Sequence, residues 1–106
     1  MKEKIRKYLS EQFNLTAEQI DTMLPAFLTT LHSHLITLEK CVEENDLERI
    51  GKAAHTIKGA LLNLGLEQSA EIAYRIEQSG KTNDESMDYS QTINILREQL
   101  SSLLDS

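Results

Sequence analysis

The amino-acid sequence predicts an all-α protein, an up-down antiparallel four-helix bundle with a short additional N-terminal helix. Its 106 residues include only four glycines and one proline, which is too few for a chain built from turns. Apolar residues recur every three or four positions over long stretches, as they do on one face of a helix. The segments between the long stretches are short, so consecutive helices must pack antiparallel. This length corresponds to a single domain, residues 1–106.

The first two expected helices are read from apolar spacing and a capping signal. Lys2 to about Phe13 carries apolar residues at helical spacing and predicts a short amphipathic helix. Thr16, with Gln19 three positions later, resembles a capping box and marks the start of a long helix. The apolar stripe of this second helix is Ile20, Leu24, Phe27, Leu31, Leu35, Leu38 and Val42. Pro25 interrupts the stripe, and it either kinks the helix or divides it into a short and a long one.

Three further helices are expected in the second half of the chain. Asp46 is a good N-cap for the third, and Gly65 is its candidate C-cap. The apolar stripe of the third helix is Leu47, Ile50, Ala53, Ala54, Ile57, Leu61 and Leu64. A fourth helix is expected over about residues 66–79, with Gly80 ending it. The fifth is expected over about residues 84–104.

Charge and composition exclude several classes of function. The formal net charge is −6, which argues against nucleic-acid binding, because that requires clustered Lys and Arg. A single cysteine, Cys41, rules out an internal disulfide and fits a reducing compartment. The N-terminus lacks the apolar stretch of a signal peptide, and no segment approaches ~20 consecutive apolar residues. We therefore expect a cytoplasmic monomer without membrane insertion, either free-standing or part of a longer protein.

His55 has the surroundings of an accessible nucleophile. At about 100° per residue, it points roughly 140° away from the apolar stripe of its helix. Gly51 and Gly59 lie one turn before and after it, and each costs about 1 kcal/mol in a helix interior. We expect both glycines to open the approach to the imidazole, while Lys58 meets an anion held on the ring. Leu62 adds an exposed apolar spot on the same face.

The sequence gives little support for a metal site or for another kind of catalytic centre. His32 and His34 point roughly 200° apart on a helix, so they cannot chelate a metal together. There is no HExxH or CxxC pattern, and we expect no metal site. His34 and Cys41 lie near the edge of the apolar stripe and are interpreted as structural. No phosphate-binding glycine loop or Ser/His/Asp set is present.

The segment AAHTIKGALLNLG closely resembles the signature of histidine-phosphotransfer (HPt) domains, HxxKG with a further glycine six residues after the first. The resemblance covers about residues 45–77. It implies that His55 accepts a phosphoryl group from a receiver-domain aspartate and passes it to another receiver. It also implies that Lys58 steadies the phosphoryl oxygens and that Gly59 allows close approach. The expected partners are response-regulator receiver domains and a hybrid histidine kinase. The chain itself needs no cofactor, since the receiver supplies Mg²⁺.

Two assignments from this resemblance stay open at the level of sequence. Glu77 is in phase with the apolar stripe of its helix, so it either orients the His55 ring or pairs with Lys58, or it is a surface carboxylate at a helix end. Leu28, His32 and Ile36 form a second, mostly apolar line on the second helix. That line is either the receiver-docking surface or the edge of the core.

Two alternative functions remain beside the phosphoryl carrier. One is a helical adaptor that docks a receiver or a kinase without carrying phosphate. The other is the phosphate-carrying domain of a chemotaxis-type kinase, which shares the HxxKG helix. An autonomous kinase is not expected, because no segment resembles an ATP-binding element and the chain is too short for a catalytic domain.

Overall fold

The computed structural model describes residues 2–104, which form five α-helices and no strand. The helices are α1 (Lys2–Phe13), α2 (Ala17–Glu43), α3 (Leu47–Asn63), α4 (Glu67–Lys81) and α5 (Tyr89–Leu104). The predicted all-α class is therefore confirmed. None of these helices combines the length and the apolar character that a membrane-spanning segment requires.

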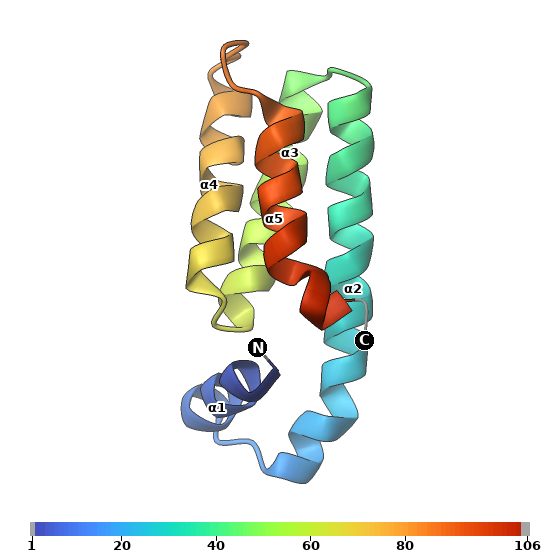
Figure 1. Ribbon diagram of the computed structural model, residues 1–106. Coiled ribbons are helices and arrows are strands. Elements are labelled where there is room, and N and C mark those ends of the chain that lie inside the picture. The colour runs from blue at the N-terminus through green and yellow to red at the C-terminus, as the bar shows by residue number, and fades with distance from the viewer. Residues whose placement is uncertain (1, 105–106) are drawn as a thin grey trace.

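The four longer helices surround a common core. α2 contacts α3 and α5, and α4 contacts the same two helices from the other side. In Figure 1 the chain reverses its direction from each of these helices to the next. α1 lies across the lower end of the molecule, where it contacts the first turns of α2 (Figure 1). The result is an elongated bundle measuring 44 × 24 × 17 Å.

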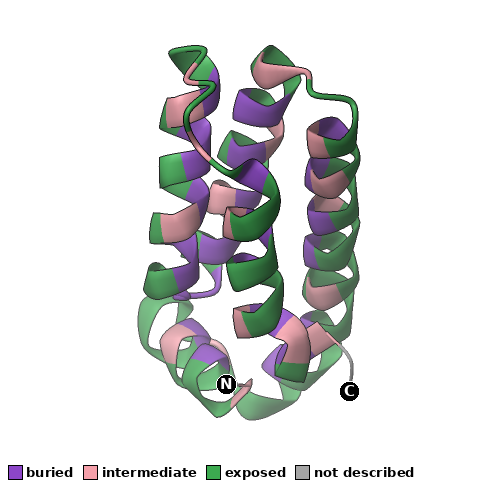
Figure 2. Ribbon diagram, turned by 45° about the horizontal axis from the view of Figure 1, so that its top comes forward, coloured by how far each residue is buried: buried purple, intermediate pink, exposed green. Residues whose placement is uncertain are grey.

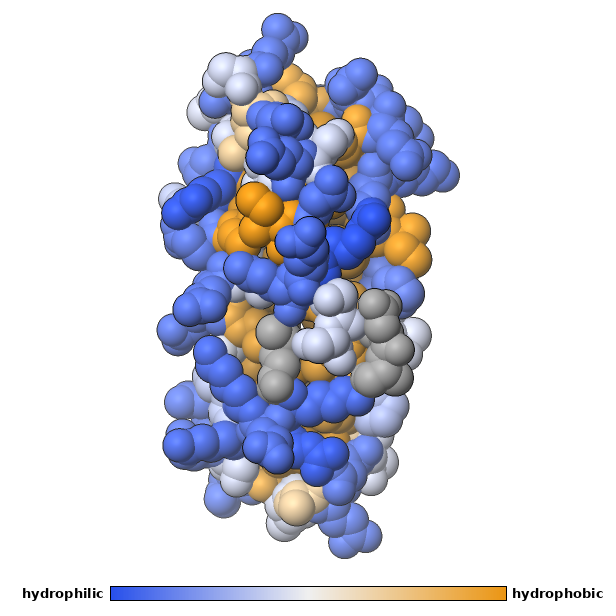
Figure 3. Space-filling view, viewed as in Figure 1, coloured by the Kyte–Doolittle hydropathy of each residue, from blue (hydrophilic) through white to orange (hydrophobic). Residues whose placement is uncertain are grey.

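The core is built from the apolar stripes of all five helices, and Figure 2 shows the buried residues on their inward sides. The side chains with no measurable exposure include Ile5, Leu31, Leu38, Ile57, Leu61, Ile76, Leu96 and Leu100. Phe27 was expected in this core, but it remains 37% exposed. Hydrophilic side chains cover most of the face seen in Figure 3, and apolar ones emerge between them. The stripes thus explain the bundle, because each helix has only one face that must leave water.

Side-chain caps start α2 and α3 where the sequence predicts. The Thr16 hydroxyl accepts a hydrogen bond from the Gln19 backbone N–H at 3.2 Å. The Thr16 N–H in turn donates to the Gln19 side chain at 2.9 Å, which completes a capping box. At the start of α3, the Asp46 carboxylate accepts from the Arg49 N–H at 3.2 Å. Each cap satisfies backbone donors that a helix start leaves without a partner.

Pro25 does not divide α2, which is one continuous helix from Ala17 to Glu43. Of the two alternatives for Pro25, the division into two helices is therefore wrong. A proline removes one backbone donor, so the carbonyl of Asp21, four residues earlier, loses its helical partner. Both residues are exposed, so water can bind that carbonyl at little cost.

The ends of the last two helices differ from the prediction. α4 continues through Gly80 to Lys81, and Asn83, two residues later, adopts a positive φ of 54°. Gly80 is therefore an interior helical residue. α5 begins at residue 89 rather than at about 84. The residue that caps its first turn is Asp88 and not Asp84, because the Asp88 carboxylate accepts a hydrogen bond from the Gln91 backbone N–H at 3.0 Å.

Gly65, in the turn between α3 and α4, gives a test of this fold. It adopts φ 73°, and a Cβ added there would lie closer than 3.0 Å to Tyr8 of α1. We expect Gly65→Ala to lower the free energy of unfolding by about 1–3 kcal/mol, measured by urea denaturation. Gly59→Ala is the control, because a Cβ at Gly59 would have no neighbour within 4 Å. It should leave stability unchanged or raise it by up to about 1 kcal/mol. Equal stability of the two variants would contradict the Tyr8 contact.

Candidate functional site

His55 lies in the middle of α3, at the edge where this helix packs on α4. Its side chain is 64% exposed, as the outward phase predicts. The ring nevertheless leans toward α4, because its Nδ1 lies 2.7 Å from Oε2 of Glu77. Glu77 itself is only 1% exposed. The site is therefore an exposed imidazole held at one nitrogen by a buried carboxylate.

Glu77 is an interior residue of α4, and three side chains surround its carboxylate. Lys58 donates to Oε1 at 2.7 Å, whereas Lys81 and His55 meet Oε2 at 2.8 and 2.7 Å. Burial by itself would raise the pKa of Glu77. The hydrogen bonds from Lys58, Lys81 and His55 outweigh burial and lower this pKa from 4.5 to about 2. The carboxylate is consequently ionised at neutral pH.

The charge of Glu77 determines where His55 carries its proton. An ionised carboxylate is an acceptor only, so the Nδ1 that meets it must be the donor. In the neutral imidazole the lone pair then belongs to Nε2. Nε2 is not the nitrogen that meets Glu77, and 64% of the side chain that carries it is exposed. The arrangement thus presents a nucleophilic nitrogen to the solvent.

The two lysines leave the site with a surplus of positive charge. Lys58 is largely covered, with 21% of its side chain exposed, and its ammonium lies 5.2 Å from the centre of the Tyr74 ring. Lys81, half exposed, was not predicted, although it follows Glu77 by one helical turn. The predicted helix end at Gly80 put Lys81 outside the helix, so its spacing from Glu77 was not considered. Two ammonium groups face one carboxylate, so one positive charge remains to attract an anion.

The two glycines expected to open the site have different environments. A Cβ at Gly59 would meet no heavy atom within 4 Å, so the space one turn after His55 is open. Gly51 is buried, and its Cβ would lie 3.3 Å from the backbone nitrogen of Lys81. The expectation that Gly51 opens the approach to His55 is wrong, because the backbone of α4 already occupies that side.

The predicted docking line on α2 does not adjoin His55. Leu28 and His32 line a hollow of about 450 Å³ whose other walls are α1 and the end of α5, and no α3 residue contributes to it. Ile36, one turn further along α2, is 54% exposed. Periodicity placed these residues off the core stripe correctly, but it could not tell which side of α2 faces α3. Leu62 of α3, in contrast, is exposed on the same face as His55 and Gly59.

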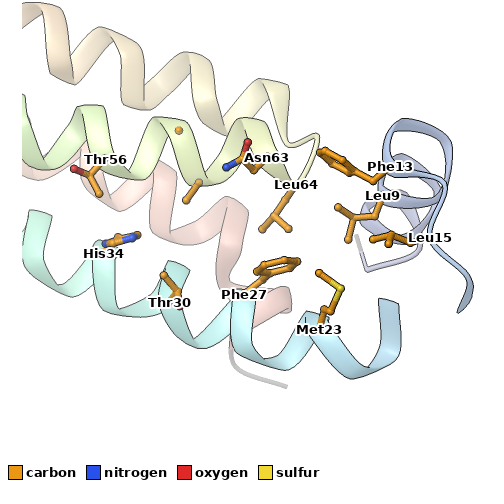
Figure 4. A pocket seen from close by; sticks show the side chains of 12 residues that line it. Leu9, Phe13, Leu15, Met23, Phe27, Thr30, His34, Thr56, Asn63 and Leu64 are labelled. Carbon is orange, nitrogen blue, oxygen red and sulfur yellow. The ribbon is translucent and has the colours of Figure 1, made fainter. Parts of the chain in front are cut away.

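A groove between α2 and α3 begins beside His55. It has a volume of about 840 Å³, and its α3 wall includes Thr56 and Gly59, the latter one turn after His55. His34, expected to be structural, lines this groove together with Phe27 on the α2 wall. Figure 4 shows Phe27 and Phe13, a residue of α1, reaching into the space beside Leu64. The groove is therefore a largely apolar surface that reaches the residues next to His55 on α3, Thr56 and Gly59.

The site is thus one exposed histidine beside a buried, ionised carboxylate on the flank of a helical bundle. Among known families, the model described as Hpt domain matches residues 22–106. The chain therefore belongs to the Hpt domain family, the histidine-phosphotransfer modules of phosphorelays, and the resemblance seen in the sequence is confirmed. The match leaves out α1 and the start of α2. No curated protein and no solved structure is significantly similar to the chain.

The low pKa of Glu77 makes stability depend on pH in a definite direction. The folded-state pKa of about 2 lies below the ordinary 4.5, so the stabilisation is complete above pH 4.5 and is lost as pH falls toward 2. We expect Glu77→Gln to lower the free energy of unfolding at pH 7 by about 3 kcal/mol. Urea titrations between pH 7 and pH 2 should show this difference from wild type shrinking in acid.

Glu71→Gln is the matched control for this prediction. Glu71 also lies on α4 and pairs with Arg75 at 3.7 Å, but 60% of its side chain is exposed. Its substitution should change stability by less than about 0.5 kcal/mol at any pH. A difference between wild type and Glu77→Gln that stays constant down to pH 2 would refute the assigned ionisation of Glu77.

Proposed function

We propose that the chain shuttles a phosphoryl group between receiver-domain aspartates through phospho-His55. The observation that carries this proposal is the hydrogen bond from His55 Nδ1 to the ionised Glu77, which leaves the Nε2 lone pair facing solvent. An acyl phosphate is already activated, so the acceptor needs no general base of its own. Membership of the Hpt domain family supports the same assignment.

In the proposed transfer, Nε2 of His55 attacks the phosphorus of a receiver aspartyl phosphate. The N–P bond forms as the O–P bond to the aspartate breaks, and the aspartate leaves as a carboxylate. Because Nδ1 keeps its proton, the phosphorylated ring carries a positive charge. The Glu77 carboxylate, 2.7 Å from Nδ1, stabilises that charge. Transfer to a second receiver is the reverse reaction with another aspartate.

The phosphoryl oxygens bring negative charge to a site that already has surplus positive charge. Lys58 holds Glu77 at 2.7 Å and lies one turn from His55, so its ammonium is placed to share its charge with those oxygens. The proposal assigns Mg²⁺ to the receiver. Among residues 2–104, no group of three or more His, Cys, Asp or Glu side chains is arranged to hold a metal ion. In this proposal the chain contributes orientation and charge and has no kinase activity of its own.

We place the receiver over the face formed by α2 and α3. Transfer requires its aspartate to come within about 3–3.5 Å of Nε2. A domain that approaches so closely covers Gly59, whose missing side chain leaves room for it, and Leu62 beside it. It also covers the apolar groove that begins at Thr56. The up-down antiparallel arrangement of four helices, supported by their ring of contacts, places α2 and α3 side by side at this face.

Phosphoryl uptake tests the assignment of His55. We expect the wild-type chain to take up acid-labile label from at least one member of a broad panel of phosphorylated receivers, and also from phosphoramidate. His55→Gln should take up none, because the amide nitrogen of glutamine shares its lone pair with the carbonyl group and is not nucleophilic.

His32→Gln is the control for this experiment, since His32 is an exposed histidine outside the site. It should take up label like the wild type. Label in His55→Gln would show that the site is wrong, and an unlabelled wild type with every donor would favour a helical adaptor over a carrier.

A second prediction concerns the groove. Phe27 is 37% exposed on the groove wall, so we expect Phe27→Ala to raise the KM for the phosphorylated receiver about tenfold, which corresponds to about 1.4 kcal/mol. Uptake from the small donor phosphoramidate should not change. Ile95→Ala, which removes a comparably exposed side chain from α5, should leave both reactions unaltered. A tenfold loss with Ile95→Ala and none with Phe27→Ala would move the docking surface to α5.

A further inference from the structure

Two glycines bring the backbones of α3 and α4 into direct contact. A Cβ on Gly80 would lie 2.7 Å from the nitrogen of Gly51 and 2.8 Å from the carbonyl oxygen of Leu47. A Cβ on Gly51 would lie 3.3 Å from the nitrogen of Lys81. All of these neighbours are backbone atoms, which cannot swing aside as a flexible side chain can. The helices can approach this closely only because both positions lack a side chain.

This contact adjoins the charged site on both helices. Gly51 precedes His55 by one turn of α3, and Gly80 lies between Glu77 and Lys81 on α4. The Glu77 carboxylate starts on α4 and binds two side chains of α3, His55 and Lys58, each at 2.7 Å. Hydrogen bonds of this kind lengthen to little more than about 3.2 Å before they weaken. The spacing of α3 and α4 therefore decides whether one carboxylate reaches both partners.

Helix formation alone gives no reason for glycine at either position. Glycine in a helix interior makes the helix less stable than alanine does, and both residues lie inside regular helices. The open surroundings of Gly59 on the same helix show a different use of glycine, since a side chain there would meet nothing within 4 Å. Gly51 and Gly80 are instead enclosed by the opposite backbone, so their effect is on helix spacing.

We propose that the Gly51–Gly80 contact is a positioning element that holds Glu77 close enough to bind His55 Nδ1 and Lys58 together. It thereby keeps His55 in the tautomer whose Nε2 is free to react. Neither glycine touches the phosphoryl group; both act through Glu77. The consequence for phosphotransfer rests on the proposed function, whereas the effect on the tautomer is a property of the chain alone.

Nitrogen-15 chemical shifts of the His55 ring, measured on the unphosphorylated protein above pH 8, test this inference. The wild type should show the protonated nitrogen at Nδ1. Gly80→Ala should lose this preference and approach the tautomer mixture of a free histidine, because the added methyl forces the helices apart. Gly51→Ala should show a smaller shift in the same direction, since its closest contact is 3.3 Å rather than 2.7 Å.

Ile93→Val is the control for a loss of stability without a change of helix spacing. Ile93 is buried on α5, and its substitution should leave the His55 tautomer as in the wild type. If Gly80→Ala does not fold, Gly51→Ala decides the question. Wild-type ring shifts in every folded glycine variant would overturn the proposal.

Phosphoramidate labelling separates this inference from the proposed function. We expect Gly80→Ala to be labelled at His55 several-fold more slowly than the wild type and Ile93→Val, with the same final extent. Equal rates together with a wild-type tautomer would refute the positioning role and leave the function of His55 standing. Absence of label in the wild type would refute the function, while the ring shifts would still decide the role of the glycines.

Discussion

The buried carboxylate of Glu77 is the constraint on which the arrangement of the site depends. An ionised group removed from water is costly unless charged partners surround it, and Glu77 has three, His55, Lys58 and Lys81. Two of these partners belong to the neighbouring helix. The carboxylate therefore ties α3 to α4 and also fixes the face of the imidazole that meets the solvent. Stability and reactivity of the site have the same physical origin.

The chemistry proposed for this chain requires only orientation and charge. Glu77 orients the ring of His55 and balances the charge that the ring gains in the proposed transfer. Lys58, held between Glu77 and Tyr74, keeps an ammonium on the same carboxylate that binds His55. A preorganised charge distribution needs no rearrangement during the reaction, which is where such sites lower a barrier. The activated donor and its metal ion are assigned to the partner.

Much of the fold could be predicted from the sequence, because apolar period and capping residues act locally. The caps at Thr16 and Asp46 and the outward direction of His55 followed from such signals. The errors in the prediction concern which helices pack against each residue. Periodicity gives the phase of a residue on its own helix, but it does not show which helix covers each flank. It therefore could not reveal that Gly51 faces α4 rather than solvent. For the same reason it left the partners of Glu77 open.

The position of α1 has a consequence for how partners are told apart. Residues 22–106 contain the Hpt domain, whereas α1 precedes them and supplies Leu9 and Phe13 to one end of the groove. Under the proposed function, part of the recognition surface thus lies outside the residues that match the Hpt domain and carry the nucleophile. Substitutions on α1 can then alter partner preference while the histidine chemistry stays intact. After a gene duplication, substitutions on α1 would let the two copies bind different partners, while His55 in each copy would stay able to carry a phosphoryl group.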